Sequence, residues 1–109
     1  MGRGVPTHLE RLDGYCRALA EYGIELEALA DAAPKHRDAR ESAKQVARLM
    51  ASDERMRTYM TERKQLPLRE LETRSGMGRK SLERHRKYII AITLILIGDF
   101  EQLHGYVSG

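Results

Sequence analysis

The sequence predicts an all-α fold, a compact bundle of about five to six helices that contains a helix-turn-helix with a long recognition helix. Apolar residues recur at helical spacing in successive segments, and no segment alternates in the manner of a strand. Apolar residues make up 41% of the chain but aromatic residues only 6%. The core must therefore be built from Leu, Ile, Ala and Met, which suits packed helices.

The chain is predicted to divide into a short lead-in and one domain, as expected for 109 residues. Residues 1–8 contain two glycines and a proline and are expected to be flexible, whereas residues 9–109 form a single helical domain. The first helix ends near Gly23, which is suited to a left-handed conformation. Its predicted buried face consists of Leu9, Leu12, Tyr15, Cys16 and Leu19.

Three more helices are predicted in the first two thirds of the chain. Residues 24–32 continue the helical pattern and stop before Pro34. Asp38 is expected to begin the next helix and to form a capping box with Glu41, and Ser52 to cap a shorter one. The predicted buried faces of these last two helices are Ala43, Val46, Ala47 and Met50, and then Met56, Tyr59 and Met60.

Residues 68–87 predict a helix, a tight turn and a second helix. Gly76 occupies the point where the turn requires a left-handed backbone. Met77 follows as the apolar residue that fills the space between the two helices. Leu71 on the first helix and Leu82 on the second are expected to face inward.

The second helix, predicted to run from Arg79 to about Ile97, is the expected recognition helix, whose N-terminal part enters the major groove of DNA. Arginine there can donate two hydrogen bonds to guanine, and Ser81 can donate to a base or a phosphate. Glu83 either accepts from cytosine or pairs with Lys87, and we favour the pair. Arg86 and Lys87 are expected to contact phosphates. The predicted DNA-contacting residues of this helix are Arg79, Lys80, Ser81, Glu83, Arg84, Arg86 and Lys87.

The rest of the predicted long helix carries two ambiguous features. His85 stands where an inward apolar residue is expected, and we favour a core histidine over a phosphate contact. Residues 88–97 are apolar on all sides, so they either lie in the core, which we favour, or form part of a docking face. A last helical turn with Phe100, Leu103, Tyr106 and Val107 is expected to fold back on the core.

The charge distribution supports a polyanion site. The net charge is only +3. Residues 1–63 hold 11 basic and 11 acidic side chains, whereas residues 64–87 hold 8 basic and 3 acidic ones. A neutral body with one basic segment is typical of nucleic-acid binding, although a solvated helix face gives the same pattern.

Several function classes are disfavoured. The four histidines are far apart and join no cysteine or carboxylate at metal-ligand spacing, so we expect no metal, no cofactor, no small-molecule substrate and no enzymatic activity. Cys16 is the one cysteine of the chain, and on its predicted buried face it is expected to be inert. The sequence begins without a signal peptide, and its longest apolar run is half a membrane span, so we expect a cytoplasmic protein.

Two stretches resemble the C-terminal domain of the sigma-I family of bacterial RNA polymerase sigma factors. The stronger stretch, residues 66–107, includes the distinctive run Arg-Lys-Ser-Leu-Glu-Arg-His-Arg-Lys-Tyr-Ile-Ile at residues 79–90. The weaker one comprises Glu-Tyr-Gly-Ile at residues 21–24 and Pro-Lys-His-Arg-Asp at residues 34–38. Gly78 departs from the family, which often has serine there, and this weakens the N-cap of the recognition helix.

The resemblance implies an alternative sigma factor whose C-terminal domain recognises the upstream (minus-thirty-five) promoter element. It also implies control by a membrane-bound anti-sigma factor. RNA polymerase would be bound through the family's N-terminal domain, which has no counterpart here, so the chain is expected to be an isolated C-terminal domain or a fragment. In this interpretation Lys35 and Arg37, beside a helix start, are candidate phosphate contacts, although the turn can equally be structural.

The alternative hypothesis is a protein-interaction module that docks a regulator through its apolar C-terminal helix without reading DNA itself. Salt dependence separates the two hypotheses. DNA binding weakens steeply as salt rises, whereas docking through Ile and Leu hardly responds.

Overall fold

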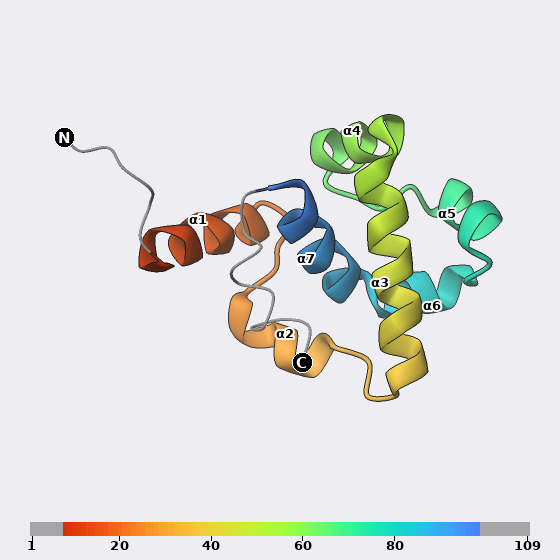
Figure 1. Ribbon diagram of the computed structural model, residues 1–109, viewed down its shortest axis with the longest axis horizontal. Coiled ribbons are helices and arrows are strands. Elements are labelled where there is room, and N and C mark those ends of the chain that lie inside the picture. Colours follow the sequence, from red (N-terminus) through yellow and green to blue (C-terminus); the bar gives the residue numbers. More distant parts are fainter. Residues whose placement is uncertain (1–7, 99–109) are drawn as a thin grey trace.

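The computed structural model describes residues 8–98 of the chain, with side chains from residue 12 onward, and every regular element in that range is a helix (Figure 1). The all-α prediction is confirmed, although the described residues form seven α-helices and one 3-10 helix, more than expected, because two predicted helices are each split. Residues 1–7 of the predicted lead-in and the predicted final turn from Phe100 to Val107 lie outside the described residues, whereas His8, the last residue of that lead-in, already belongs to the first helix. The elements are α1 (His8–Ala20), η1 (Leu26–Ala28), α2 (Leu29–Ala32), α3 (Arg37–Ser52), α4 (Glu54–Arg63), α5 (Leu68–Ser75), α6 (Arg79–Arg84) and α7 (Arg86–Ile97).

Helix α7 forms the centre of the fold because it is apolar on every side. All eight residues from Tyr88 to Ile95 are buried. Helix α3 packs along α7, and α1 and α2 also contact it (Figure 1). The core interpretation is thereby confirmed for residues 88–95, and these residues have no surface left for the alternative docking role, whereas Leu96 is exposed.

The amphipathic helices supply the rest of the core as their spacing predicts. The buried face of α3 is the predicted one, Ala43, Val46, Ala47 and Met50. On α1, Tyr15 and Leu19 are buried, and the Tyr15 hydroxyl donates to the Ala91 carbonyl oxygen at 2.9 Å, which links α1 to α7. Cys16 is only partly buried, because it lies at the edge of that face, so its assignment to the core was wrong. Burial is nevertheless the main cause that raises its pKa, which keeps the thiol protonated.

Two predicted helix caps were wrong. Helix α3 begins at Arg37 rather than Asp38, and its N-cap residue, His36, makes no side-chain capping bond within the described structure. Arg40 fixes the entry to this helix instead, because its guanidinium donates to the carbonyl oxygens of Pro34 and Lys35 at 3.3 and 3.1 Å. With the turn held this way, Asp38 is left in the first helical turn, where the helix dipole favours its charge.

The second cap is displaced by one residue. Asp53, not Ser52, caps α4, and its carboxylate accepts from the Met56 amide at 3.1 Å. The Ser52 hydroxyl donates back to the Leu49 carbonyl oxygen at 3.0 Å, so it belongs to the end of α3. A carboxylate at this position also gains from the positive end of the helix dipole.

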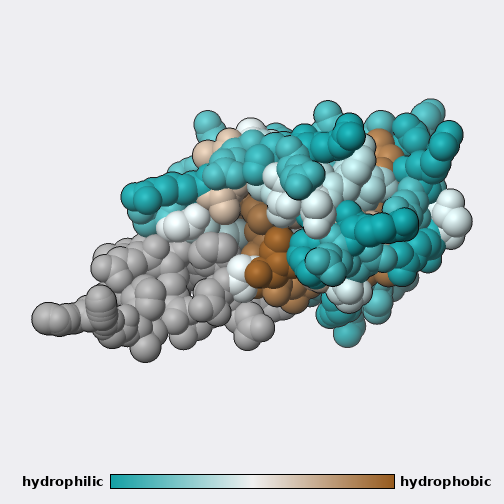
Figure 2. All heavy atoms as spheres, turned by 90° about the horizontal axis from the view of Figure 1, so that it is seen from above, coloured by the Kyte–Doolittle hydropathy of each residue, from teal (hydrophilic) through white to brown (hydrophobic). Residues whose placement is uncertain are grey.

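The outer surface is strongly polar, in line with the 32% of residues that are charged. Figure 2 shows one face that is largely hydrophilic, with one group of apolar side chains near its middle and a smaller one at its upper right. Among the described residues, the large apolar side chain that is exposed is Leu96, at 37%. The described structure contains no helix that is long and apolar enough to cross a membrane.

Replacing Leu82 with alanine is expected to destabilise the fold by about 2–5 kcal/mol, because the side chain is fully buried and its loss leaves a cavity. Urea denaturation measures the change. Leu96→Ala is the matched control and should cost less than Leu82→Ala, since 37% of Leu96 is exposed and its truncation leaves no enclosed cavity. Equal effects of the two substitutions would contradict the inward position of Leu82.

Candidate nucleic-acid interface

Helices α5 and α6 form the predicted helix-turn-helix, and Gly76 makes the turn between them. Gly76 has φ 79° and donates its amide to the Glu72 carbonyl oxygen at 3.2 Å, closing α5. A Cβ atom at this position would meet nothing within 4 Å. Glycine is therefore needed for the left-handed backbone and not for lack of space.

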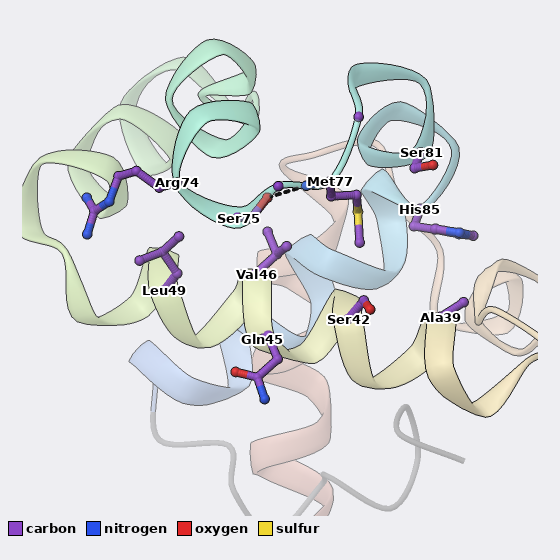
Figure 3. Close-up of a pocket in the computed structure, with 12 residues that line it drawn as sticks. Ala39, Ser42, Gln45, Val46, Leu49, Arg74, Ser75, Met77, Ser81 and His85 are labelled. Atoms are coloured by element: carbon purple, nitrogen blue, oxygen red, sulfur yellow. Dashed lines mark hydrogen bonds between the residues drawn. The ribbon is translucent and has the colours of Figure 1, made fainter.

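The turn is anchored by side chains that the sequence identified. Leu71 on α5 and Leu82 on α6 are both fully buried, as predicted. Met77 is partly buried against the core, and in Figure 3 it projects from the turn toward α3 while Val46 projects from α3 toward the turn. The Ser75 hydroxyl donates to the Leu71 carbonyl oxygen and accepts from the Met77 amide, so one side chain joins α5 to the turn.

Helix α6 carries five of the nine predicted site residues. Ser81 is half-buried and, with His85, lines one side of a groove of about 750 Å³ between α3 and the turn (Figure 3). Four side chains of α6 are exposed: Arg79, Lys80, Glu83 and Arg84. Three of these four are cationic, so the surface of the short helix is basic.

The predicted continuous helix from Arg79 to Ile97 is wrong, because the chain breaks at His85. His85 has φ −101° and ψ 18°, and it ends α6 and begins α7. His85 thus separates α6, which lies at the surface with four exposed polar side chains, from α7, which runs through the core. The His85 imidazole is half-buried at the groove, and burial, with a smaller contribution from Arg84, lowers its pKa.

Arg86 does not face outward as predicted. Its guanidinium is half-buried and donates to the carbonyl oxygens of Tyr22 and Lys64 at 3.4 and 3.3 Å. The break at His85 turns Arg86 toward the ends of α1 and α4. The contact of Arg86 with a phosphate stays a prediction, although two backbone oxygens already occupy one nitrogen of its guanidinium.

The predicted pair between Glu83 and Lys87 is also missing from the ion pairs of the described residues, because the helix break lies between the two positions. Lys87 is exposed at the start of α7. Arg79 instead faces Glu72 of α5, with 3.6 Å between its Nε and the Glu72 carboxylate. This contact holds Arg79 close to α5 through its Nε.

No protein-family model matches the chain. The RNA polymerase sigma factor SigI of Bacillus subtilis (strain 168) is 39% identical to it over 93 residues, which are 85% of this chain and 37% of that protein. SigI3 of Acetivibrio thermocellus is 37% identical over 100 residues, 92% of this chain and 40% of that protein. SigI of Bacillus anthracis is 38% identical over 91 residues, 84% of this chain and 38% of that protein.

The chain belongs to the sigma-I family. It does so as a C-terminal domain, which confirms the resemblance found in its sequence. The sigma-I domain described here spans about two fifths of the length of these relatives.

The two other predicted site residues of this sigma-I domain lie at the start of α3. Lys35 and Arg37 are exposed. Ala39 and Ser42, which follow them, line the same groove as Ser81 and His85, so the beginning of α3 lies beside α6 (Figure 3). Lys35 and Arg37 thus stand near the end of α3 that neighbours α6, and their contact with DNA stays a prediction.

Sequence reasoning missed an ion-pair network that fixes α5 against α4. The Arg74 guanidinium lies 2.6 Å from the Asp53 carboxylate and 3.7 Å from that of Glu70. Glu70 also pairs with Arg55 at 2.9 Å. Asp53 caps α4, so Arg74 connects the first helix of the helix-turn-helix to the start of α4. Asp53 and Arg74 are 21 residues apart, so no local sequence pattern indicates that they pair.

The described residues contain no group of three or more His, Cys, Asp or Glu side chains that could hold a metal ion. The arrangement offers hydrogen-bond donors and positive charge on a short exposed helix. Such a surface is suited to binding a polyanion.

The Arg74–Asp53 pair predicts a specific acid dependence of stability. The hydrogen bond from Arg74, followed by that from the Met56 amide, lowers the pKa of Asp53 below its ordinary value of 3.8. A carboxyl whose pKa is lower in the folded state contributes stability that is present above its unfolded pKa and is lost as pH falls through the folded pKa. The free energy of unfolding should therefore fall below pH 3.8 less steeply in Asp53→Asn than in the unmodified protein.

Denaturation at a series of pH values measures this difference. Asparagine can still cap α4, so Asp53→Asn removes the charge of the side chain and keeps the helix cap. Arg74→Gln removes the largest cause of the pKa shift and should flatten the profile in the same way. Parallel profiles for all three proteins would show that the pair contributes nothing to acid stability.

Proposed function

We propose that this chain is a sequence-specific DNA-binding domain that recognises the upstream (minus-thirty-five) promoter element with α6 in the major groove. The observation that carries the proposal is the exposed basic face of α6, presented by a helix-turn-helix whose turn is made by Gly76. In such motifs the N-terminal residues of the second helix contact base edges. The named function of the sigma-I relatives supports DNA as the ligand.

The exposed side chains of α6 divide by chemistry. We assign Arg79 and Arg84 to guanine, since a guanidinium donates to O6 and N7 together. We assign Lys80 to a base or a phosphate and half-buried Ser81 to a phosphate or base. Glu83 forms no ion pair within the described part of the chain, and we assign it to a cytosine amino group.

Phosphate contacts are assigned to residues flanking α6. Lys87 is exposed at the start of α7, and Lys35 and Arg37 are exposed at the start of α3. Contacts of this kind fix the register of a protein on the duplex and carry no sequence information. Each should also add to the salt dependence of binding.

The larger role proposed is transcription initiation as part of an alternative sigma factor in the bacterial cytoplasm. The relatives are named RNA polymerase sigma factors, and this chain corresponds to 37–40% of their length. We propose that RNA polymerase is bound mainly through the remainder of such a protein. The domain alone should then bind promoter DNA without supporting transcription.

Control by a membrane-bound anti-sigma factor is proposed from the family resemblance. Because Tyr88–Ile95 are buried, such a factor would have to bind another surface than the apolar face of α7. This separates the proposal from the alternative of an interaction module that docks through that helix.

Lys80→Ala and Arg84→Ala are each expected to weaken specific DNA binding by about 1–3 kcal/mol if the residue contacts a base. The duplex is first selected from a random-sequence pool with the unmodified protein, and fluorescence anisotropy then measures affinity. Arg17→Ala, which removes an exposed cation from the distant α1, is the matched control and should bind as the unmodified protein does. Unchanged affinity of the Lys80→Ala/Arg84→Ala double variant would refute the assignment of α6.

The salt series of the same experiment tests the class of ligand. The affinity for DNA should fall with a log–log slope near −0.9 for each phosphate contacted. A protein that selects no duplex, yet binds a protein partner with little response to salt, would favour the interaction-module hypothesis instead.

A further inference from the structure

We propose that Arg86 is a positioning residue that sets the orientation of the recognition helix α6. It does so by joining the first residue of α7 to the C-terminal ends of α1 and α4. The effect of Arg86 on DNA binding rests on the proposed function. Its effect on the orientation of α6 rests only on the contacts of Arg86.

The contacts of Arg86 bring together three segments that are far apart in sequence. One guanidinium nitrogen, Nη2, donates both to the Tyr22 carbonyl oxygen at 3.4 Å and to the Lys64 carbonyl oxygen at 3.3 Å. These partners lie 64 and 22 residues before it. A single side chain therefore spans the turn after α1, the end of α4 and the start of α7.

The two acceptors have a shared electrostatic character. Tyr22 follows α1, which ends at Ala20, and Lys64 is the C-cap of α4, with φ 58° and ψ 34°. The last carbonyl groups of a helix lack partners within the helix and carry partial negative charge. Tyr22 lies two residues beyond α1, so both acceptors are close to a helix C-terminus, where the dipole favours a cation, and arginine has the donors and the permanent charge for it.

A second set of contacts holds the two acceptors next to each other. The Lys64 ammonium lies 2.8 Å from the Glu21 carboxylate and 5.0 Å from the centre of the Tyr22 ring. The hydrogen bond that the Lys64 ammonium donates to Glu21 is the main cause that raises the pKa of Lys64. Tyr22 and Lys64 are thus linked independently of Arg86, so they offer it a preformed pair of acceptors.

Helix α6 depends on such anchors because it is too short to hold its own direction. It has six residues, and isolated helices of this length are unstable. Its N-terminal side is fixed by the Gly76 turn, and its centre by the buried Leu82. After the break at His85, Arg86 is the first residue with a described contact to α1 and α4, so it fixes where the C-terminal end of α6 can lie. Base recognition requires side chains held on such a rigid support.

Three substitutions separate positioning from the other possible roles. Arg86→Gln removes both hydrogen bonds, and Arg86→Lys keeps the charge on a shorter side chain, whose ammonium should not reach both acceptors. Lys87→Gln removes the same charge from an exposed neighbour. Arg57→Gln breaks a bond of the same kind, from an arginine to the Ala51 carbonyl oxygen at the end of α3, away from α6.

Affinities are measured for the duplex selected from a random pool and for a scrambled duplex, over a salt series and below the melting temperature of each variant. Arg86→Gln and Arg86→Lys should lose about tenfold in affinity for the selected duplex, as when one base contact is lost. Their affinity for the scrambled duplex and their salt slope should match those of the unmodified protein. Lys87→Gln should weaken both duplexes alike and reduce the slope by about 0.9. Arg57→Gln should lower the melting temperature and leave the ratio of the two affinities unchanged.

Two results for Arg86→Gln would overturn the inference. A reduced salt slope would identify Arg86 as a phosphate contact. A lowered melting temperature with an unchanged ratio of the affinities for the two duplexes would identify a purely structural bond. Residual dipolar couplings of the α6 amides without DNA give a readout that needs no ligand. The orientation of α6 relative to α3 should change in Arg86→Gln and not in Arg57→Gln. If the unmodified protein selects no duplex, the proposed function fails, and unchanged couplings in Arg86→Gln would still refute the role of Arg86.

Discussion

The burial of α7 is the constraint on which the rest of the structure depends. A helix with eight consecutive buried residues has to lie at the centre of a small domain. The polar residues just before it must then reach the surface within a few positions. The break at His85 marks the boundary between the two, where the exposed α6 ends and the buried α7 begins.

Placing a short helix at the surface creates a second requirement, since α6 needs support from elements on either side. Leu82 anchors it from below, and Gly76 with Ser75 and Met77 fixes its approach. Arg74 holds the preceding helix against α4 through Asp53. These contacts make the helix-turn-helix a rigid extension of the bundle, so its exposed cations are presented in a defined arrangement.

The sequence predicted the parts of the site that follow from local pattern. Leu71, Gly76 and Leu82 were identified because helical spacing and a left-handed turn leave few residues suited to each position. The inward turn of Arg86 was missed, because its acceptors at Tyr22 and Lys64 are distant in sequence and are backbone atoms, which leave no trace in side-chain patterns. The Asp38 cap failed for a similar reason, since Arg40 holds that turn through two carbonyl oxygens.

A titration of the isotope-labelled protein with its selected duplex, followed by NMR, tests the central claim most directly. The account predicts that the largest shifts fall on the side chains and amides of α6 and on Lys87, while the outer face of α1 stays unchanged. Shifts confined to another surface, with α6 unmoved at saturating DNA, would contradict it.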